Sequence, residues 1–192
     1  MDGKGKGHEI LASELVFDGR VFKAFVDDIR LPDGREARWE RVSHPGAVGM
    51  VPVLADGLLV MVRQYRNAVG GELLEIPAGK LEPGESPMEC AHRELVEETC
   101  YRAGEMVKLA EFYNSPGYSD ERFHLYLARG LVSEQGQSEP DEFLEVVEID
   151  IEEALEMVSE GSIRDAKSII GVTLARLFLR GEVTPYLSPG PA

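Results

Sequence analysis

The chain has few cysteines, few aromatic residues and no apolar segment long enough to span a membrane. Its two cysteines, Cys90 and Cys100, fall within one expected helical segment, too far apart along the axis to form a disulfide. This excludes a fold held by disulfides and favours a reducing compartment. The first residues, MDGKGKGHE, are polar and do not resemble a signal peptide. We therefore expect a cytoplasmic protein.

Positive charge is also scarce. Lysine and arginine total 20 against 35 aspartate and glutamate residues, which gives a formal net charge of −15. A surface of this sign argues against binding to nucleic acid or to an anionic membrane through neutralised phosphates. An anionic substrate would need a bound metal ion or a local group of arginines.

The length of 192 residues and the hydrophobic fraction of 43% suit one domain with a short appended segment. Alternating apolar and polar residues predict strands within Glu9–Val42, with turn signals at 17–20 and 31–34. We expect residues 8–45 to form an antiparallel meander that contributes to dimerisation and to substrate contacts. A sheet this small needs a partner surface.

The main domain is expected at 46–182, followed by a loose tail at 183–192. The apolar run Gly46–Val62, broken at Asp56-Gly57, predicts two buried strands joined by a tight turn. Further strands are expected at 73–78, 107–113, 122–128 and 143–149, and helices at 152–159 and 163–179. This order predicts a mixed α/β/α sandwich.

One segment, Gly79–Tyr101, carries the strongest functional signal. Ser86 and Pro87 mark a helix start, with Glu89 placed for a capping box, and the helix should end near Thr99. The helical repeat then puts the carboxylates Glu94, Glu97 and Glu98 close together. Such like-charged pairs destabilise a bare helix by about 0.2–0.5 kcal/mol each. A hard divalent cation would offset this repulsion, whereas an ordinary acidic face would simply be solvated.

The same segment resembles the Nudix box, GX5EX7REUXEEXGU with U aliphatic, at Gly79, Glu85, Arg93, Glu94, Leu95, Glu97 and Glu98. The chain departs from it at Cys100, where the family has glycine, and carries Tyr101 in the last position. Pro116 lies at the distance beyond the box that is typical of the ADP-ribose pyrophosphatase branch. The segments Gln64–Arg66, His44–Val48, Glu75–Gly79 and Asp141–Val146 are similar to that branch as well.

The resemblance implies an α/β/α sandwich and hydrolysis of a nucleoside diphosphate linked to another group. It implies Mg²⁺, with Mn²⁺ as the other choice, held by Glu94 and Glu98 with contributions from Glu97, Glu82 and the Ala78 carbonyl. Glu97 and Glu98 would then also act in catalysis. Gly79, Glu85 and Arg93 are expected to be structural, the last two as an ion pair between loop and helix.

A general base is expected from a late loop, with Glu142 preferred and Glu139 second. Expected substrate contacts are Arg38, Trp39, Glu40, Arg63, Arg66, Glu75 and Pro116, although surface ion pairs and simple packing would explain several of them equally well. Because the resemblance implies that the segment around Trp39 serves a neighbour's site, we expect a homodimer.

The expected reaction is conversion of ADP-ribose to AMP and ribose 5-phosphate. A GDP-mannose or other nucleotide-sugar pyrophosphatase is the first alternative, since those enzymes share most of these motifs. A nucleotide-binding sensor is an alternative of another class, but such modules tend to lose box carboxylates that this chain retains.

Overall fold

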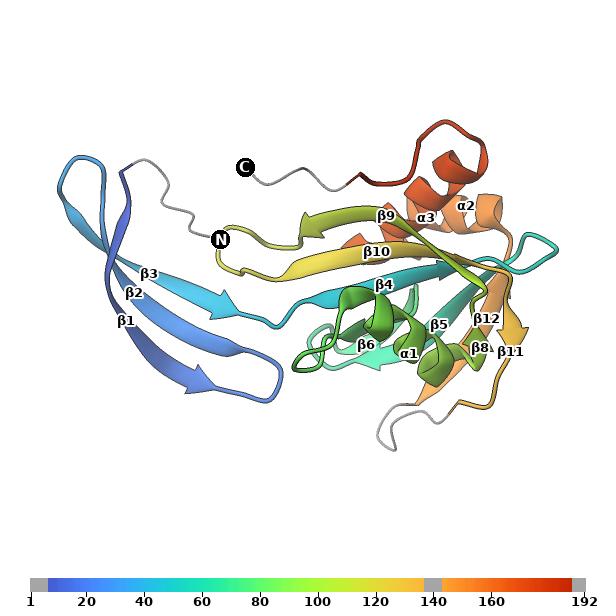
Figure 1. Ribbon diagram of the computed structural model, residues 1–192, viewed down its shortest axis with the longest axis horizontal. Helices are drawn as coiled ribbons and strands as arrows, with labels where there is room; N and C mark the ends of the chain where they lie inside the picture. Colours follow the sequence, from blue (N-terminus) through green and yellow to red (C-terminus); the bar gives the residue numbers. More distant parts are fainter. Residues whose placement is uncertain (1–6, 137–142, 188–192) are drawn as a thin grey trace. The chain divides into compact units, whose positions relative to one another are not determined.

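A computed structural model describes residues 7–136 and 143–187 (Figure 1). In chain order its elements are β1 (Glu9–Asp18), β2 (Lys23–Arg30), β3 (Glu36–Ser43), β4 (Ala47–Pro52), β5 (Leu59–Arg66), β6 (Gly71–Glu75), β7 (Ala78–Lys80), α1 (Pro87–Thr99), β8 (Tyr101–Arg102), β9 (Glu105–Tyr113), β10 (Arg122–Arg129), β11 (Val132–Ser133), β12 (Leu144–Ile149), α2 (Ile151–Glu160) and α3 (Ala166–Leu179). None of the helices within the described ranges is both long and apolar enough to cross a membrane.

The chain divides into two compact units, and the smaller one combines residues 1–46 with 113–122. Its sheet is the antiparallel meander β1-β2-β3, drawn in blue in Figure 1. Gly34, with a φ of 88°, allows the tight turn between β2 and β3. Strand β1 is exposed along its whole length, whereas β2 buries Asp27 and Ile29. The predicted meander is thus confirmed.

The loop 113–122 joins this unit through backbone hydrogen bonds. The Val42 N–H donates to the Tyr118 carbonyl at 2.7 Å, and the Asp120 N–H donates to the Val42 carbonyl at 3.1 Å. The Asp120 carboxylate also accepts from the His44 N–H at 2.8 Å. Because these bonds join segments far apart in sequence, local sequence patterns did not predict them.

The larger unit comprises residues 47–112 and 123–192. One of its sheets has the order β7-β4-β10-β9, with β4 parallel to β10 and antiparallel to β7. A second sheet has the order β12-β5-β6, with both neighbours antiparallel to β5. The expected tight turn after β4 is present, but β4 and β5 enter different sheets. Strand β7 was not expected, because only Ala78–Lys80 pair there with β4.

Two apolar cores lie on opposite faces of these strands. Alternate residues of β10 point to opposite sides, so Leu125 and Leu127 join one core and Tyr126 joins the other. The first core is covered by α2 and α3, and the second by α1, which packs on β4 and β7. A strand that is buried on both faces has a nearly continuous run of apolar residues in its sequence. The predicted α/β/α sandwich is confirmed.

Candidate active site

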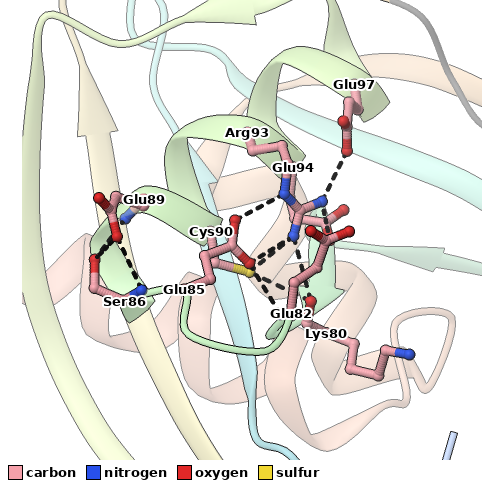
Figure 2. Close-up of polar contacts among 9 residues, drawn as sticks. All are labelled: Lys80, Glu82, Glu85, Ser86, Glu89, Cys90, Arg93, Glu94 and Glu97. Atoms are coloured by element: carbon pink, nitrogen blue, oxygen red, sulfur yellow. Dashed lines mark hydrogen bonds and ion pairs between the residues drawn. The ribbon is translucent and has the colours of Figure 1, made fainter.

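The helix α1 begins as its sequence predicts. The Ser86 hydroxyl accepts a hydrogen bond from the Glu89 N–H at 3.3 Å, and the Glu89 carboxylate accepts from the Ser86 N–H at 2.9 Å and from its hydroxyl at 2.6 Å (Figure 2). These bonds lower the pKa of Glu89. The capping box provides hydrogen-bond acceptors for backbone N–H groups at the helix start. It thereby fixes the residue at which α1 begins, and with it the positions of Glu94 and Glu98 on the helix.

Arg93 lies at the centre of the box residues in Figure 2. Its Nε and Nη2 donate to the two carboxylate oxygens of Glu85 at 2.8 and 2.9 Å, and Nη2 also reaches the Lys80 carbonyl at 3.3 Å. The hydrogen bonds from Arg93 lower the pKa of Glu85 to about 2, and the same bonds raise the pKa of the guanidinium. This charge-assisted pair ties the loop to the helix, as predicted.

The remaining contacts of Arg93 involve the expected metal ligands. Its Nη1 donates to Glu94 Oε1 at 2.8 Å and to Glu97 Oε2 at 2.9 Å. Among the residues that the structure describes, no three acidic, histidine or cysteine side chains are grouped so as to hold a metal ion. In this arrangement the positive charge of the Arg93 guanidinium offsets the repulsion between these two glutamates.

Glu98 is held differently, by the backbone of β7. Its side chain is buried, with the residue 5% exposed, and Oε2 accepts from the Ala78 N–H at 2.8 Å. Gly79 follows, and a Cβ there would lie only 1.8 Å from the carboxyl carbon of Glu94. The backbone at Ala78–Gly79 is therefore packed directly against two box carboxylates, which explains physically why the box needs glycine.

This donor set suits a hard divalent cation. Carboxylate oxygens of Glu94, Glu97 and Glu98, together with backbone oxygens, are the ligands that Mg²⁺ prefers. The close approach of Gly79 leaves no side chain between β7 and Glu94. An ion that took up Glu94 and Glu97 would replace their bonds to Arg93, which would keep its paired bonds to Glu85.

Glu82, another expected ligand, is exposed in the loop before α1. Its N–H donates to Glu85 Oε2 at 3.0 Å and its carbonyl accepts from the Glu85 N–H at 3.1 Å, so its backbone shapes the turn. At the other end of α1, Cys100 has a left-handed backbone with φ 57° and ψ 31°. It is the one residue other than glycine with a positive φ in the described ranges. Cys100 therefore holds a backbone conformation that is strained for a residue with a side chain.

The arginines expected to bind substrate have different surroundings. Arg63 pairs with Glu145 at 3.0 Å on the surface. Arg66 donates twice to Glu75 Oε2, at 2.8 and 2.7 Å, and the Glu75 side chain is only 2% exposed. Lys167 reaches the other oxygen of Glu75 at 2.9 Å. No sequence signal indicated Lys167, because it lies at the start of a core-packing helix outside every motif.

Three of the candidates in the smaller unit line a cavity of about 510 Å³. Trp39, Glu40 and Pro116 contribute to its wall, and so do His8 and Tyr118, which the sequence did not indicate. Trp39 is 49% exposed, and its ring lies 5.7 Å from that of His8 between centroids.

Arg38 is not part of this cavity wall. Arg38 pairs instead with Glu14 at 3.2 Å and with Asp28 at 3.4 Å. Glu139 and Glu142 lie outside the described residues.

Comparison with known proteins covers nearly the whole chain. The chain is 40% identical over 176 residues to an ADP-ribose pyrophosphatase of Bacillus subtilis, and the match covers 91% of this chain and 95% of that protein. It is 42% identical over 177 residues to a methanol dehydrogenase activator of Bacillus methanolicus, covering 91% and 96%. A GDP-mannose pyrophosphatase of Escherichia coli is 35% identical over 155 residues, covering 74% and 81%.

A solved structure and a family model also match this chain. The crystal structure of an ADP compounds hydrolase superposes with a TM-score of 0.81 at 25% identity, covering 93% of this chain and 98% of that one. The NUDIX domain model matches residues 43–169, which include the whole box. The chain belongs to the Nudix family.

Proposed function

We propose that this protein hydrolyses the pyrophosphate bond of ADP-ribose to AMP and ribose 5-phosphate, with Mg²⁺ or Mn²⁺ as cofactor. The observation that carries the proposal is the packing of Glu94 and Glu98 against the backbone of Ala78 and Gly79. Support for the substrate comes from the relative named for ADP-ribose, whose length this chain covers almost completely.

In the reaction, water adds to one phosphorus and the bond from that phosphorus to the bridging oxygen breaks. The leaving phosphate keeps the bridging oxygen, and the protons of the water pass to the base and the products. A divalent metal would supply positive charge for the phosphate oxygens and acidify a bound water. Glu94 and Glu98 would hold it, with Glu97, Glu82 and the Ala78 carbonyl as further donors. Glu142 would receive a proton, and Glu139 is the second candidate.

The chain's own residues would orient these groups. Arg93 positions the loop before α1 through its bond to Glu85. The Ala78 N–H holds the buried Glu98 near the end of α1. Both parts of the box are therefore positioned before substrate binds. Arg66 presents a partly exposed guanidinium whose orientation is set by Glu75. Arg63, also partly exposed, is a second candidate for the pyrophosphate.

The nucleoside end of the substrate would bind to the smaller unit of a neighbouring copy. An adenine stacks well on aromatic side chains, and Trp39 lines a cavity together with Tyr118 and Pro116. Arg38 and Glu40 would contribute polar contacts. We also propose that the protein is a homodimer, because β1 exposes large apolar residues, Ile10, Val16 and Phe17 among them, that a second copy would cover. We propose a cytoplasmic location as well, because the free cysteines Cys90 and Cys100 favour a reducing compartment.

Two alternatives are separable from this proposal. The GDP-mannose relative supports a nucleotide-sugar pyrophosphatase, and parallel measurement of turnover on ADP-ribose and GDP-mannose decides between them. A sensor would bind ADP-ribose in calorimetry and release no AMP. Turnover of ADP-ribose with kcat/KM well above that for GDP-mannose supports the proposal, and the reverse order refutes the substrate assignment.

A further inference from the structure

A buried network of four charged residues connects α3 to β5 and β6. Glu75 accepts from Arg66 through one carboxylate oxygen and from Lys167 through the other, at 2.7 and 2.9 Å. Lys167 also contacts Asp165 Oδ1 at 2.8 Å. The side chains of Glu75, Lys167 and Asp165 are at most 15% exposed, whereas that of Arg66 is 38% exposed. Arg66 is therefore the end of the network that meets solvent.

The network also reaches the backbone that leads to the box. Ser168, next to Lys167, accepts from the Ile76 N–H at 2.9 Å through a fully buried hydroxyl. Asp165 caps α3 by accepting from the Ser168 N–H at 3.1 Å. Two residues after Ile76, the Ala78 N–H donates to Glu98. The start of α3 thus fixes both the side chain of Glu75 and the strand end from which β7 continues.

A buried carboxylate with a single partner is costly, and removal of one of two partners leaves charge uncompensated. With Lys167 present, the formal charges of Arg66, Lys167, Glu75 and Asp165 sum to zero. Without Lys167 they sum to −1, and the guanidinium of Arg66 must compensate Glu75 alone. The attraction of Arg66 for an anionic substrate would fall accordingly.

We propose that Lys167 is a positioning residue for substrate binding: it shares the charge of Glu75 and thereby keeps the Arg66 guanidinium oriented toward solvent for a phosphate. The inference rests on the proposed function, in which Arg66 meets the pyrophosphate. The Lys167 side chain is largely buried against Glu75, so in this proposal it acts through Arg66 and does not touch the substrate. Its role differs from that of the box residues, because it acts on binding and not on the chemical step.

The test compares Lys167→Met with Lys167→Arg in ADP-ribose hydrolysis. Lys167→Met should raise KM by about tenfold, the effect of one unit charge at roughly 10 Å in an effective dielectric of about 20. Its kcat should change by less than about threefold, because the Ile76–Ser168 and Ala78–Glu98 bonds do not involve Lys167. Lys167→Arg retains the charge and should restore most of the affinity.

Arg176→Met is the matched control, since Arg176 also lies on α3 and forms an ion pair, but with Glu152 of α2 at 3.2 Å. It should leave KM unchanged. An unchanged KM in Lys167→Met, or an equal rise in Arg176→Met, would overturn the inference. Failure of Lys167→Arg to restore KM would do so as well.

A second readout does not depend on turnover. The Arg66 Nε–H bond to Glu75 should give a resolved nitrogen–proton NMR signal in the wild type. This signal should shift or broaden in Lys167→Met and remain in Arg176→Met. An identical signal in Lys167→Met would contradict the positioning role. If the wild type fails to hydrolyse ADP-ribose, the proposed function fails, and the NMR comparison still decides whether Lys167 orients Arg66.

Discussion

Gly79 and Glu94 lie so close together that a Cβ on Gly79 would come within 1.8 Å of the Glu94 carboxyl carbon. The contact joins β7 to α1 at the point where the box glutamates gather. Any side chain at position 79 must therefore move either the strand or the glutamate.

Replacing Gly79 with alanine should accordingly displace Glu94 and lower both stability and activity. We expect a loss of about 1–3 kcal/mol in the free energy of unfolding, measured by urea denaturation, because the Glu94 carboxylate must swing away from the added methyl group and give up its bond to Arg93. Gly71→Ala is the matched control, since nothing lies within 4 Å of a Cβ there and its φ is not positive. Equal stability of the two variants would show that the Gly79 contact is not tight.

Glu98→Gln should abolish most turnover while the fold persists. The glutamine oxygen can still accept from the Ala78 N–H, so the local structure is kept, but one negative charge is lost. A metal contributes several kcal/mol to such reactions, so we expect a fall in kcat of roughly 100-fold or more. Glu156→Gln, an exposed acid on α2, should retain wild-type kcat. Retention of activity in Glu98→Gln would exclude Glu98 as a metal ligand.

The Glu85–Arg93 pair predicts a pH dependence of stability. Folding lowers the pKa of Glu85 from 4.5 to about 2, because Arg93 hydrogen-bonds its charged form. The stabilisation is complete above the unfolded pKa and is lost as pH falls from about 4.5 toward 2. Thermal unfolding of wild type and Glu85→Gln across this range measures it. The difference between them should shrink as the solution becomes more acidic, and a difference independent of pH would contradict the pairing.

Cys100→Gly should stabilise the protein. The left-handed backbone at Cys100 costs a residue with a side chain about 1–2 kcal/mol, whereas glycine adopts it freely but loses more entropy on folding. We expect a net gain of about 0.5–1 kcal/mol in the free energy of unfolding. Cys100→Ala keeps a Cβ and should show no such gain. A destabilised Cys100→Gly variant would mean that the thiol makes a contact worth more than the strain.

Local sequence signals predicted α1 closely. The Ser86–Pro87 start, the capping box to Glu89 and the end at Thr99 all depend on interactions within a few residues, which spacing alone can reveal. The pairing of Glu85 with Arg93 was also predictable, because only the cap residue and the first turns of α1 separate them and their charges are opposite. The order of strands and helices then sufficed for the α/β/α class.

The rest depends on contacts between segments far apart in sequence. That β4 and β5 enter different sheets follows from their pairing with β10 and β12, which no local pattern encodes. The same holds for Lys167 against Glu75. The bonds from Arg93 to Glu94 and Glu97 differ in kind, because the resemblance implies a metal ion as the partner of these carboxylates and gives no role to Arg93 there.

In the proposed reaction the box carboxylates hold a divalent cation for hydrolysis of a diphosphate. The most direct measurement is product analysis of ADP-ribose incubated with the protein in Mg²⁺ and in excess chelator. We expect equimolar AMP and ribose 5-phosphate with Mg²⁺ and neither product with chelator. Equal product formation under both conditions, or none under either, would contradict it.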